Sequence, residues 1–342
     1  MEKNSAGVDP VSILEIARRA NVSPATVSRV FNRPEKVSEA TREHVRAICS
    51  ELGYRPNASA RTLRTQRSRV LGVILPTLVN PVFAECLQGI AQATAALGYS
   101  IMPATTDYRV ETEQEAVATL QSFGVDGMIL VVSDAETSLA LQMLVQRHRP
   151  YALVYNRHPH HPTVSVAGDT AMCDIVHELV QFGHRRIAMV CGQLDASDRA
   201  QQRLAGFIHG MHKAGLAPHP LIEVPFVEKA IEDVAKVLRA PSRPTALVCS
   251  NDLIAIRALR AAHECGLNVP GDLSITGFDG IRLGQDLTPI LSTIVQPNHE
   301  MGRRSVGLLL HALHEGRQPR ASESITLPYH FFRGESCAQA PF

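Results

Sequence analysis

The sequence predicts an all-α helix-turn-helix module joined to a larger α/β body made of two parallel-sheet halves. Three observations lead to this prediction. Helix start and stop signals recur three times within residues 12–53. From residue 70 onward, short apolar runs alternate with segments of helical period, which is the pattern of βαβ units. Residues 1–69 carry 13 Lys and Arg against 7 Asp and Glu, whereas residues 70–342 carry 21 against 26.

The first two helices are predicted from their capping residues. Ser12, followed three residues later by Glu15, has the spacing of a capping box, and the break comes at Asn21. Ser23 is placed to cap a second helix, whose first residue, Pro24, needs no backbone N–H there. The inward-facing residues of this pair are Ile13, Ile16, Ala17, Ala20, Val27, Val30 and Phe31.

The second helix leaves several residues facing outward near its N-terminal end, where a recognition helix meets the DNA major groove. These residues are Pro24, Ala25, Thr26, Ser28 and Arg29. Arg29 suits a bidentate contact to guanine, and Ala25 suits a thymine methyl. Thr26 or Ser28 would bind phosphate. Taken alone, the segment also fits an ordinary helical hairpin.

A third helix, predicted over 41–52 behind a Ser38 cap, supplies the core that such a module needs. The chain then reads Gly-Tyr-Arg-Pro-Asn. Earlier stretches read Ser-x-x-Glu-Ile-Ala, Val-Ser-x-x-Thr-Val-Ser-Arg-Val-Phe-Asn and Val-Ser-x-x-Thr-Arg. In this order and spacing the motifs resemble the lactose-repressor (LacI/GalR) family. The resemblance implies a transcriptional regulator, most often a repressor, that binds palindromic double-stranded operator DNA as a homodimer or higher oligomer and responds to a small-molecule effector.

The segment that begins at Asn57 has helical character but is too short to be stable alone, so it should fold only on DNA. The resemblance implies a hinge helix in the minor groove, with Leu63 wedged between base steps and Ala60 and Arg61 near the backbone. Leu63 also fits a linker residue packed on the body. We therefore expect a DNA-binding domain at 10–56, a hinge helix and linker at 57–69, and an effector-binding and dimerisation domain at 70–334.

The body is predicted as two successive βαβ series. The first has strands at 70–75, 99–104 and 127–132, with helices at 81–97, 111–123 and 135–146. The second has strands at 186–191, 246–249 and 273–277, helices at 200–214, 229–238, 252–265 and 299–314, and a terminal region at 325–332. The candidate crossovers between the halves are 151–161 and 291–297. The resemblance implies the type I periplasmic-binding-protein architecture, in which two lobes enclose a cleft.

The loops after the predicted strands supply candidate effector-binding residues, because ligands lie at the carboxyl ends of parallel strands. The candidates are Asn80, Phe83, Arg203, Asn251, Asp279 and Gln296. The resemblance implies that Asn80 bonds the effector and that Phe83 forms an apolar wall. It also implies that Arg203, Asn251 and Asp279 bind hydroxyl or acid groups of the effector. Asn80 also fits a helix cap, Phe83 a core residue, and the others structural caps or ion-pair partners.

These donors and acceptors together suit a sugar or a sugar acid. Two stretches, around Asn80 and around residues 284–289, resemble gluconate-type members of the family, which favours a sugar acid with Arg203 as its partner. The chain has no Trp, so the indole that stacks on sugars in some members is missing.

Other functional classes lack their motifs. The sequence has no phosphate-binding Gly-rich loop, no G-x-S-x-G elbow and no catalytic constellation, so we expect neither an enzyme nor a cofactor. The prolines around His158, His160 and His161 favour an exposed loop over a metal site. Seven cysteines without a Cys-x-x-Cys pair fit a reducing cytoplasm, and no signal peptide or membrane span is predicted. The alternative is a solute-binding receptor without DNA regulation, which the basic N-terminal module disfavours.

Overall fold

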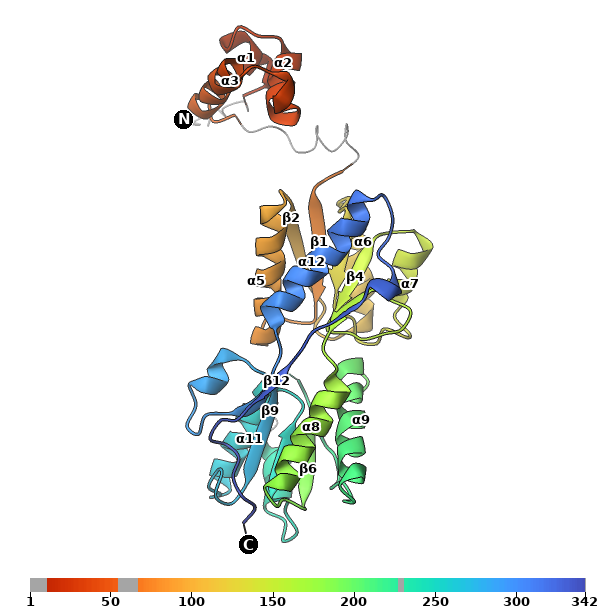
Figure 1. Ribbon diagram of the computed structural model, residues 1–342, viewed down its shortest axis with the longest axis vertical. Helices are drawn as coiled ribbons and strands as arrows, with labels where there is room; N and C mark the ends of the chain where they lie inside the picture. The colour runs from red at the N-terminus through yellow and green to blue at the C-terminus, as the bar shows by residue number, and fades with distance from the viewer. Residues whose placement is uncertain (1–10, 55–66, 227–230, 342) are drawn as a thin grey trace, which may run out of the picture. The chain divides into compact units, whose positions relative to one another are not determined.

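The computed structural model describes residues 11–54, 67–226 and 231–341. The chain divides between Ser68 and Arg69 into two compact units (Figure 1). The smaller unit is helical, and the larger unit contains two sheets. The predicted fold class is therefore confirmed. No helix in the described part of the chain is long and apolar enough to span a membrane.

The helices of the small unit begin at the predicted capping serines. They are α1 (Ile13–Arg19), α2 (Pro24–Asn32), the 3₁₀ turn η1 (Pro34–Lys36) and α3 (Glu39–Glu51). The Ser12 hydroxyl accepts a hydrogen bond from the Glu15 backbone N–H at 3.2 Å. The Glu15 carboxylate does not complete the capping box, because it binds Arg18 at 2.8 Å. The three helices pack against one another through their apolar faces. The fully buried residues are Ile16, Val27, Val30 and Val45.

The first lobe of the large unit is a six-stranded sheet with the strand order β11-β5-β4-β3-β1-β2, in which every pair is parallel. Its strands are β1 (Val70–Leu75), β2 (Ser100–Thr105), β3 (Gly127–Leu130), β4 (Tyr151–Val154), β5 (Thr163–Ser165) and β11 (Ile325–Thr326). Its helices are α5 (Pro81–Ala96), α6 (Val110–Ser122), α7 (Leu139–Gln146) and α12 (Asn298–His314). The short 3₁₀ turn η3 (Ala321–Glu323) precedes β11.

The second lobe repeats the plan with the strand order β12-β10-β9-β8-β6-β7, and only β12 runs antiparallel. Its strands are β6 (Ile187–Gly192), β7 (Ile222–Val224), β8 (Ala246–Cys249), β9 (Ser274–Asp279), β10 (Ser292–Val295) and β12 (His330–Phe332). Its helices are α8 (Gly168–Gln181), α9 (Asp198–Lys213), α10 (Ile231–Leu238), α11 (Asp252–Glu264) and the 3₁₀ turn η2 (Arg282–Gln285).

Within the described residues, three connections cross between the lobes: β5 to α8, β10 to α12, and β11 to β12 (Figure 1). The predicted crossover at 151–161 is wrong, because 151–154 is a strand of the first lobe and the chain crosses only after β5. The predicted crossover at 291–297 is correct only at its end, since 292–295 forms β10. The crossing between β11 and β12 was not predicted.

Strand β7 was not predicted, and two helices also differ from the prediction. Helix α8 was missed, because no side chain caps its start at Gly168 and the sequence there gives no start signal. Helix α7 begins at Leu139 rather than at 135, because the Asp134 carboxylate accepts bonds from the Glu136 N–H and the Thr137 hydroxyl. These bonds make a turn that delays the helix until Ser138 caps it.

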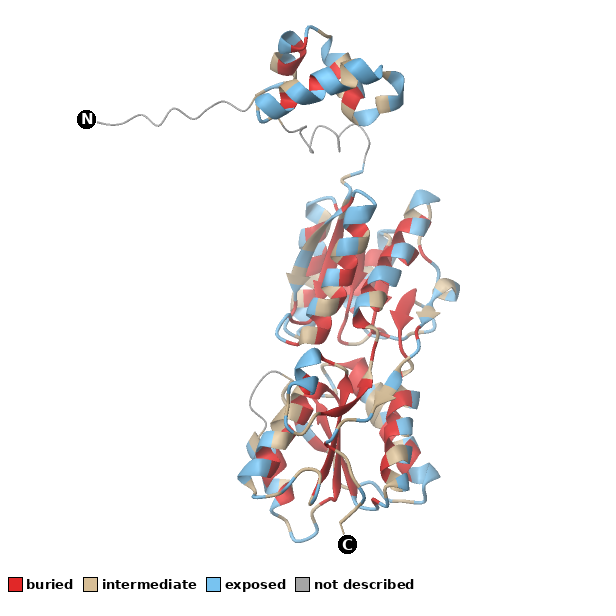
Figure 2. Ribbon diagram, turned by 60° about the vertical axis from the view of Figure 1, so that its left-hand side comes forward, coloured by how far each residue is buried: buried red, intermediate tan, exposed pale blue. Residues whose placement is uncertain are grey.

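Both sheets are covered by helices, and their central strands are buried, whereas the edge strands β2, β11 and β12 are partly exposed (Figure 2). The closest helix packing in the first lobe joins α5 to α12 through two glycines. A Cβ atom added at Gly302 would lie 2.2 Å from the Cys86 carbonyl oxygen, and one at Gly89 would lie 2.1 Å from the His299 carbonyl oxygen. Helix α12, late in the sequence, is thus an integral part of the first lobe.

Candidate functional site

A narrow cavity, partly open to solvent, lies where the two lobes meet; the centre of a water molecule can reach about 30 Å³ of it, and the free space between its walls is about 410 Å³ with the open mouth included. Loops at the carboxyl ends of strands from both sheets line it, as expected for a site in parallel sheets. Its lining residues are Asn80, Val82, Phe83, Tyr108, Tyr155, Ser197, Arg199, Ala200, Arg203, Phe226, Ser250, Asn251 and Asp279. The first five belong to the first lobe and the rest to the second.

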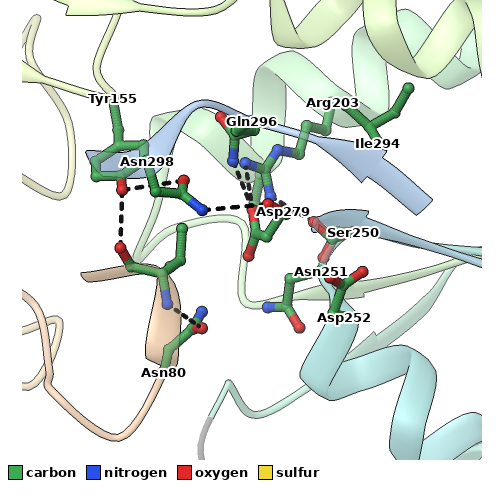
Figure 3. A network of polar contacts seen from close by, with 12 residues as sticks. Asn80, Tyr155, Arg203, Ser250, Asn251, Asp252, Asp279, Ile294, Gln296 and Asn298 are labelled. Atoms are coloured by element: carbon green, nitrogen blue, oxygen red, sulfur yellow. Dashed lines mark hydrogen bonds and ion pairs between the residues drawn. The ribbon is translucent and has the colours of Figure 1, made fainter. Parts of the chain in front are cut away.

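Asp279, the last residue of β9, is the hub of the polar network in the cavity (Figure 3). Its Oδ1 accepts hydrogen bonds from Gln296 Nε2 at 2.7 Å and from Arg203 Nη2 at 3.3 Å. Its main-chain oxygen accepts from Asn298 Nδ2 at 3.3 Å. The residue has a φ of +118° and is almost fully buried, so the fold holds its carboxylate in one orientation.

The buried acids near this hub have altered proton affinity. Burial raises the pKa of Asp279, while Arg203, Asn80 and Gln296 favour its ionised form. Asp252 lies fully buried at the start of α11, and burial together with the charge of Asp279 raises its pKa to about 8. At neutral pH, Asp252 is therefore mostly protonated, whereas Asp279 is the acid that the Arg203 guanidinium stabilises in its ionised form.

Arg203, on α9, is already paired within the protein. Nη1 donates to the Ser250 carbonyl oxygen and Nη2 donates to Asp279. The guanidinium lies 3.8 Å from the centre of the Phe278 ring, which is a cation–π contact. Both terminal nitrogens are used in this way, so little of its charge is available to an acidic ligand.

Asn80 and Asn251 have the same role in the two lobes. Each is the N-cap of a helix and uses its side-chain oxygen, which accepts from Val82 N at 3.3 Å and from Ile254 N at 2.8 Å respectively. The structural interpretation of both asparagines as helix caps is thus correct. Because both also line the cavity, a cap and a ligand contact are compatible at these positions.

Aromatic side chains form two walls of the cavity. Phe83 packs edge-on against Tyr155 with ring centres 5.5 Å apart, and Phe83 is itself buried. Tyr108 from the first lobe stacks on Phe226 from the second, with centres 4.7 Å apart and planes 10° from parallel. This second pair forms a flat apolar surface that joins the lobes, in a chain without Trp.

A second polar network joins the lobes beside the cavity, centred on Asp198 and Arg199 at the start of α9. Asp198 accepts two bonds from Asn156 Nδ2, at 2.9 and 3.0 Å, and its backbone N–H donates to the Ser133 carbonyl oxygen at 2.7 Å. Arg199 Nη1 donates to the Val132 carbonyl oxygen at 2.7 Å and to Asp198 at 3.2 Å. These contacts tie α9 of the second lobe to the strand ends of the first.

Five of the six predicted ligand residues line the cavity: Asn80, Phe83, Arg203, Asn251 and Asp279. Gln296 does not line this cavity. Its Nε2 donates to Asp279 Oδ1, and the residue borders a smaller adjoining cavity. Four further lining residues, Tyr108, Tyr155, Arg199 and Phe226, were not predicted. They follow strands β2, β4, β6 and β7, which is the same signal that points to Asn80 after β1.

On the small unit, the outward face of α2 is available for contacts with DNA. Pro24, Ala25 and Arg29 are exposed, and Thr26 and Ser28 are half-buried. Thr26 Oγ1 lies 2.9 Å from the Ser23 hydroxyl. None of the ion pairs among the described residues involves Arg29. The predicted hinge residues Asn57, Ala60, Arg61 and Leu63 lie outside the described residues.

The histidine-rich loop makes hydrogen bonds within the protein. His158 Nε2 lies 2.7 Å from Glu136, and His161 Nδ1 lies 2.6 Å from the Tyr151 hydroxyl. Over the ranges that the structure describes, no group of three or more His, Cys, Asp or Glu side chains converges to hold a metal ion.

Comparisons with known proteins match both units. Residues 12–57 match the family model of bacterial regulatory proteins of the lacI family, and residues 176–337 match that of a periplasmic binding protein-like domain. The ribose operon repressor of Haemophilus influenzae is 35% identical over 306 residues, covering 87% of this chain and 91% of that protein.

Solved structures are similar over most of the chain. The lac repressor dimer bound to operator and the anti-inducer ONPF has a TM-score of 0.87 at 28% identity, covering 96% of this chain and 100% of that one. A LacI family transcriptional regulator from Enterococcus faecium with bound ribose has a TM-score of 0.70 at 25% identity, covering 79% and 99%. These relatives are transcriptional regulators.

Proposed function

The chain belongs to the lacI family of bacterial regulatory proteins, and on this basis we propose that it is a repressor whose affinity for operator DNA is controlled by a sugar bound between its lobes. The observation that carries the proposal is the cavity, to which both lobes contribute polar side chains. A ligand there contacts both lobes at once, so its binding energy depends on how they are arranged. We assign the protein no catalytic role, and we expect it to act in the cytoplasm, where operator DNA lies.

The DNA-reading role is proposed for residues 10–56, with α2 in the major groove and Arg29 as its base-reading side chain. Residues 57–69 are proposed as the hinge, in which Asn57, Ala60, Arg61 and Leu63 meet the minor groove. One such module covers a half-site, so two copies of the chain on a palindrome are required for specific binding. Residues 70–334 are proposed to bind the effector and to pair the two copies.

Coupling between the sites is proposed to run through the first lobe, which follows the hinge directly in the chain. The ligand bridges residues of both lobes, and the three connections between the lobes act as the pivot. A change in lobe angle in each of two subunits alters the separation of the two hinge segments and so their ability to fold on DNA. The sugar class is supported by the ribose-bound structure and by the polar, partly aromatic lining of the cavity.

The test uses the full chain and two measurements. Genomic fragments bound by the protein are selected and sequenced, and operator affinity is then measured by anisotropy with and without a panel of aldoses. We expect a palindromic site whose affinity falls steeply with salt, and an aldose that changes this affinity at least tenfold. Asp279→Asn should remove the response to that aldose while operator affinity without sugar stays within twofold.

The substitution to Asn is preferred to Ala, because loss of the carboxylate volume would also leave Arg203 buried without an acceptor. An exposed aspartate, Asp286, provides the matched control as Asp286→Asn. A normal sugar response in Asp279→Asn would refute the assignment of the cavity as the effector site. Failure to enrich any DNA site, with or without sugars, would refute the regulator itself.

A further inference from the structure

Arg199 differs from every other charged group that lines the cavity, because part of its guanidinium has no partner. Its side chain is nine-tenths buried, and Nη1 is held by Val132 and Asp198. Nη2 is buried and has no hydrogen-bond partner among the described residues. A buried charged donor that is left unsatisfied costs free energy, so this position favours an acceptor supplied from outside the protein.

Arg203 lies four residues later on the same face of α9 and lacks this property. Its two terminal nitrogens bind Ser250 and Asp279, and its plane covers Phe278. The sequence pointed to Arg203 as the partner of an acidic ligand. The geometry instead leaves Arg199 as the arginine with a donor to offer, and Arg199 borders both the main cavity and the smaller one beside it.

Each arginine at the cavity already has a carboxylate partner, and the buried Glu113 is a further acid whose ionised form Arg199 favours. Arg199 is paired with Asp198 at 3.2 Å, and Arg203 is paired with Asp279 at 3.3 Å. The nearby Asp252 has a pKa raised to about 8 and adds little charge at neutral pH. A ligand carboxylate would therefore bring a buried charge without a counter-ion, which is costly, whereas an uncharged oxygen would not.

We propose that Arg199 is a specificity-determining residue of the effector site, and that its Nη2 binds an uncharged oxygen acceptor, a hydroxyl or carbonyl oxygen, of a neutral sugar. The same guanidinium holds the Val132 carbonyl oxygen of the first lobe through Nη1. A ligand oxygen bound to Arg199 Nη2 therefore also holds in place the side chain that links the second lobe to the first. This inference rests on the proposed function, because it presumes that the cavity binds a sugar.

The experiment compares matched pairs of probes on the purified full chain by titration calorimetry. The pairs are D-ribose with D-ribonate, D-xylose with D-xylonate, D-glucose with D-gluconate, and D-galactose with D-galactonate. We expect at least one aldose to bind, and its aldonate to bind at least tenfold more weakly. Arg199→Gln should weaken binding of that aldose at least tenfold, whereas Lys213→Gln, an exposed cation on the same helix, should leave it unchanged.

Monodeoxy forms of the bound aldose separate a ligand contact from a structural role. In the wild type, removal of the oxygen that Arg199 binds should weaken affinity about as much as Arg199→Gln does. In Arg199→Gln, the same removal should cost little, because the contact is already lost. If Arg199→Gln does not fold, the double variant Asp198→Asn with Arg199→Gln removes both buried charges and is used in its place.

The outcomes are distinct. Tighter binding of an aldonate overturns the uncharged class, and additive effects of Arg199→Gln with every deoxygenation overturn the contact. An aldose that binds Arg199→Gln as well as the wild type overturns the role of Arg199 but leaves the proposed function standing. If no member of any pair binds the wild type, the sugar-binding part of the proposed function fails, and this inference fails with it.

Discussion

Asp252 shows how one buried residue can set the pH dependence of the whole fold. Its carboxylate accepts bonds from the Thr293 hydroxyl at 2.6 Å and the Ile281 N–H at 2.8 Å, yet burial and the neighbouring Asp279 raise its pKa from 3.8 to about 8. In the unfolded chain the group ionises near pH 4. The stability associated with its protonated form is therefore present at low pH and is lost as pH rises toward 8.

We expect the free energy of unfolding to fall from pH 5 to pH 8, with Asp252 contributing at most about 1.4 kcal/mol per pH unit. Asp252→Asn should stay close to the wild type in stability at pH 5, because its amide, like the protonated carboxyl, offers one carbonyl acceptor and one donor, and its pH dependence should be shallower. Urea titrations across this range measure both quantities, with Asp286→Asn as the exposed control. Parallel pH profiles for the wild type and Asp252→Asn would contradict the assignment.

Contacts between individual side chains are also the feature that the sequence predicts least well. The positions of Arg203 and Asp279 after predicted strands indicate correctly that both line the cavity. They do not indicate that the two side chains bind each other. The distinction between Arg199 and Arg203, two arginines on one helix, depends on partners more than 40 residues away, Val132 and Ser250. No local pattern encodes such partners.

At the scale of elements, the contact between α5 and α12 is limited by two glycines. A methyl group on Gly302 would meet the Cys86 carbonyl oxygen at 2.2 Å, so the helices would have to separate. Gly302→Ala should lower the free energy of unfolding by about 1–3 kcal/mol. Gly307 lies on the same helix with nothing within 4 Å of an added Cβ, so Gly307→Ala should be neutral or stabilising by up to about 1 kcal/mol. Equal unfolding midpoints in urea for the two variants would show that the helices can move apart freely.

The recognition helix α2 carries a second prediction at this scale. Arg29→Ala should weaken binding to the selected operator by about 1–3 kcal/mol and relax base preference at one position, with a smaller effect on random DNA. Arg46→Ala, an exposed arginine on α3, serves as the control. Equal losses on operator and random DNA would mean that Arg29 binds phosphate rather than a base.

Elements with a strong local signal were predicted well. The capping serines and buried apolar runs placed α1, α2, β1 and β8 at or close to their observed bounds. Helix α8 and the three-residue strands β5 and β7 were missed, because the helix has no cap residue and the strands are too short to show a period. The lobe crossings depend on which strands pair, and pairing between distant segments leaves no signal in a single sequence.

For the whole molecule, the proposed hinge links the two units and should matter to DNA binding alone. Leu63→Ala should weaken specific operator binding at least tenfold, because an apolar wedge between base steps would be lost, while sugar affinity stays unchanged. Anisotropy on operator DNA and calorimetry with the bound aldose measure the two effects on one preparation. A parallel loss of sugar affinity would place Leu63 in the packing of the large unit instead.

The repeated crossing of the chain between lobes also bears on how the protein is made. The first lobe receives α12 and β11 only after most of the second lobe has been translated, and β12 of the second lobe follows, so both lobes remain incomplete on the ribosome until these elements emerge. The N-terminal unit has its own core and is complete after a sixth of the chain. Stop codons between the N-terminal unit and β11 are therefore expected to share one phenotype: a small helical unit that folds, with neither lobe complete.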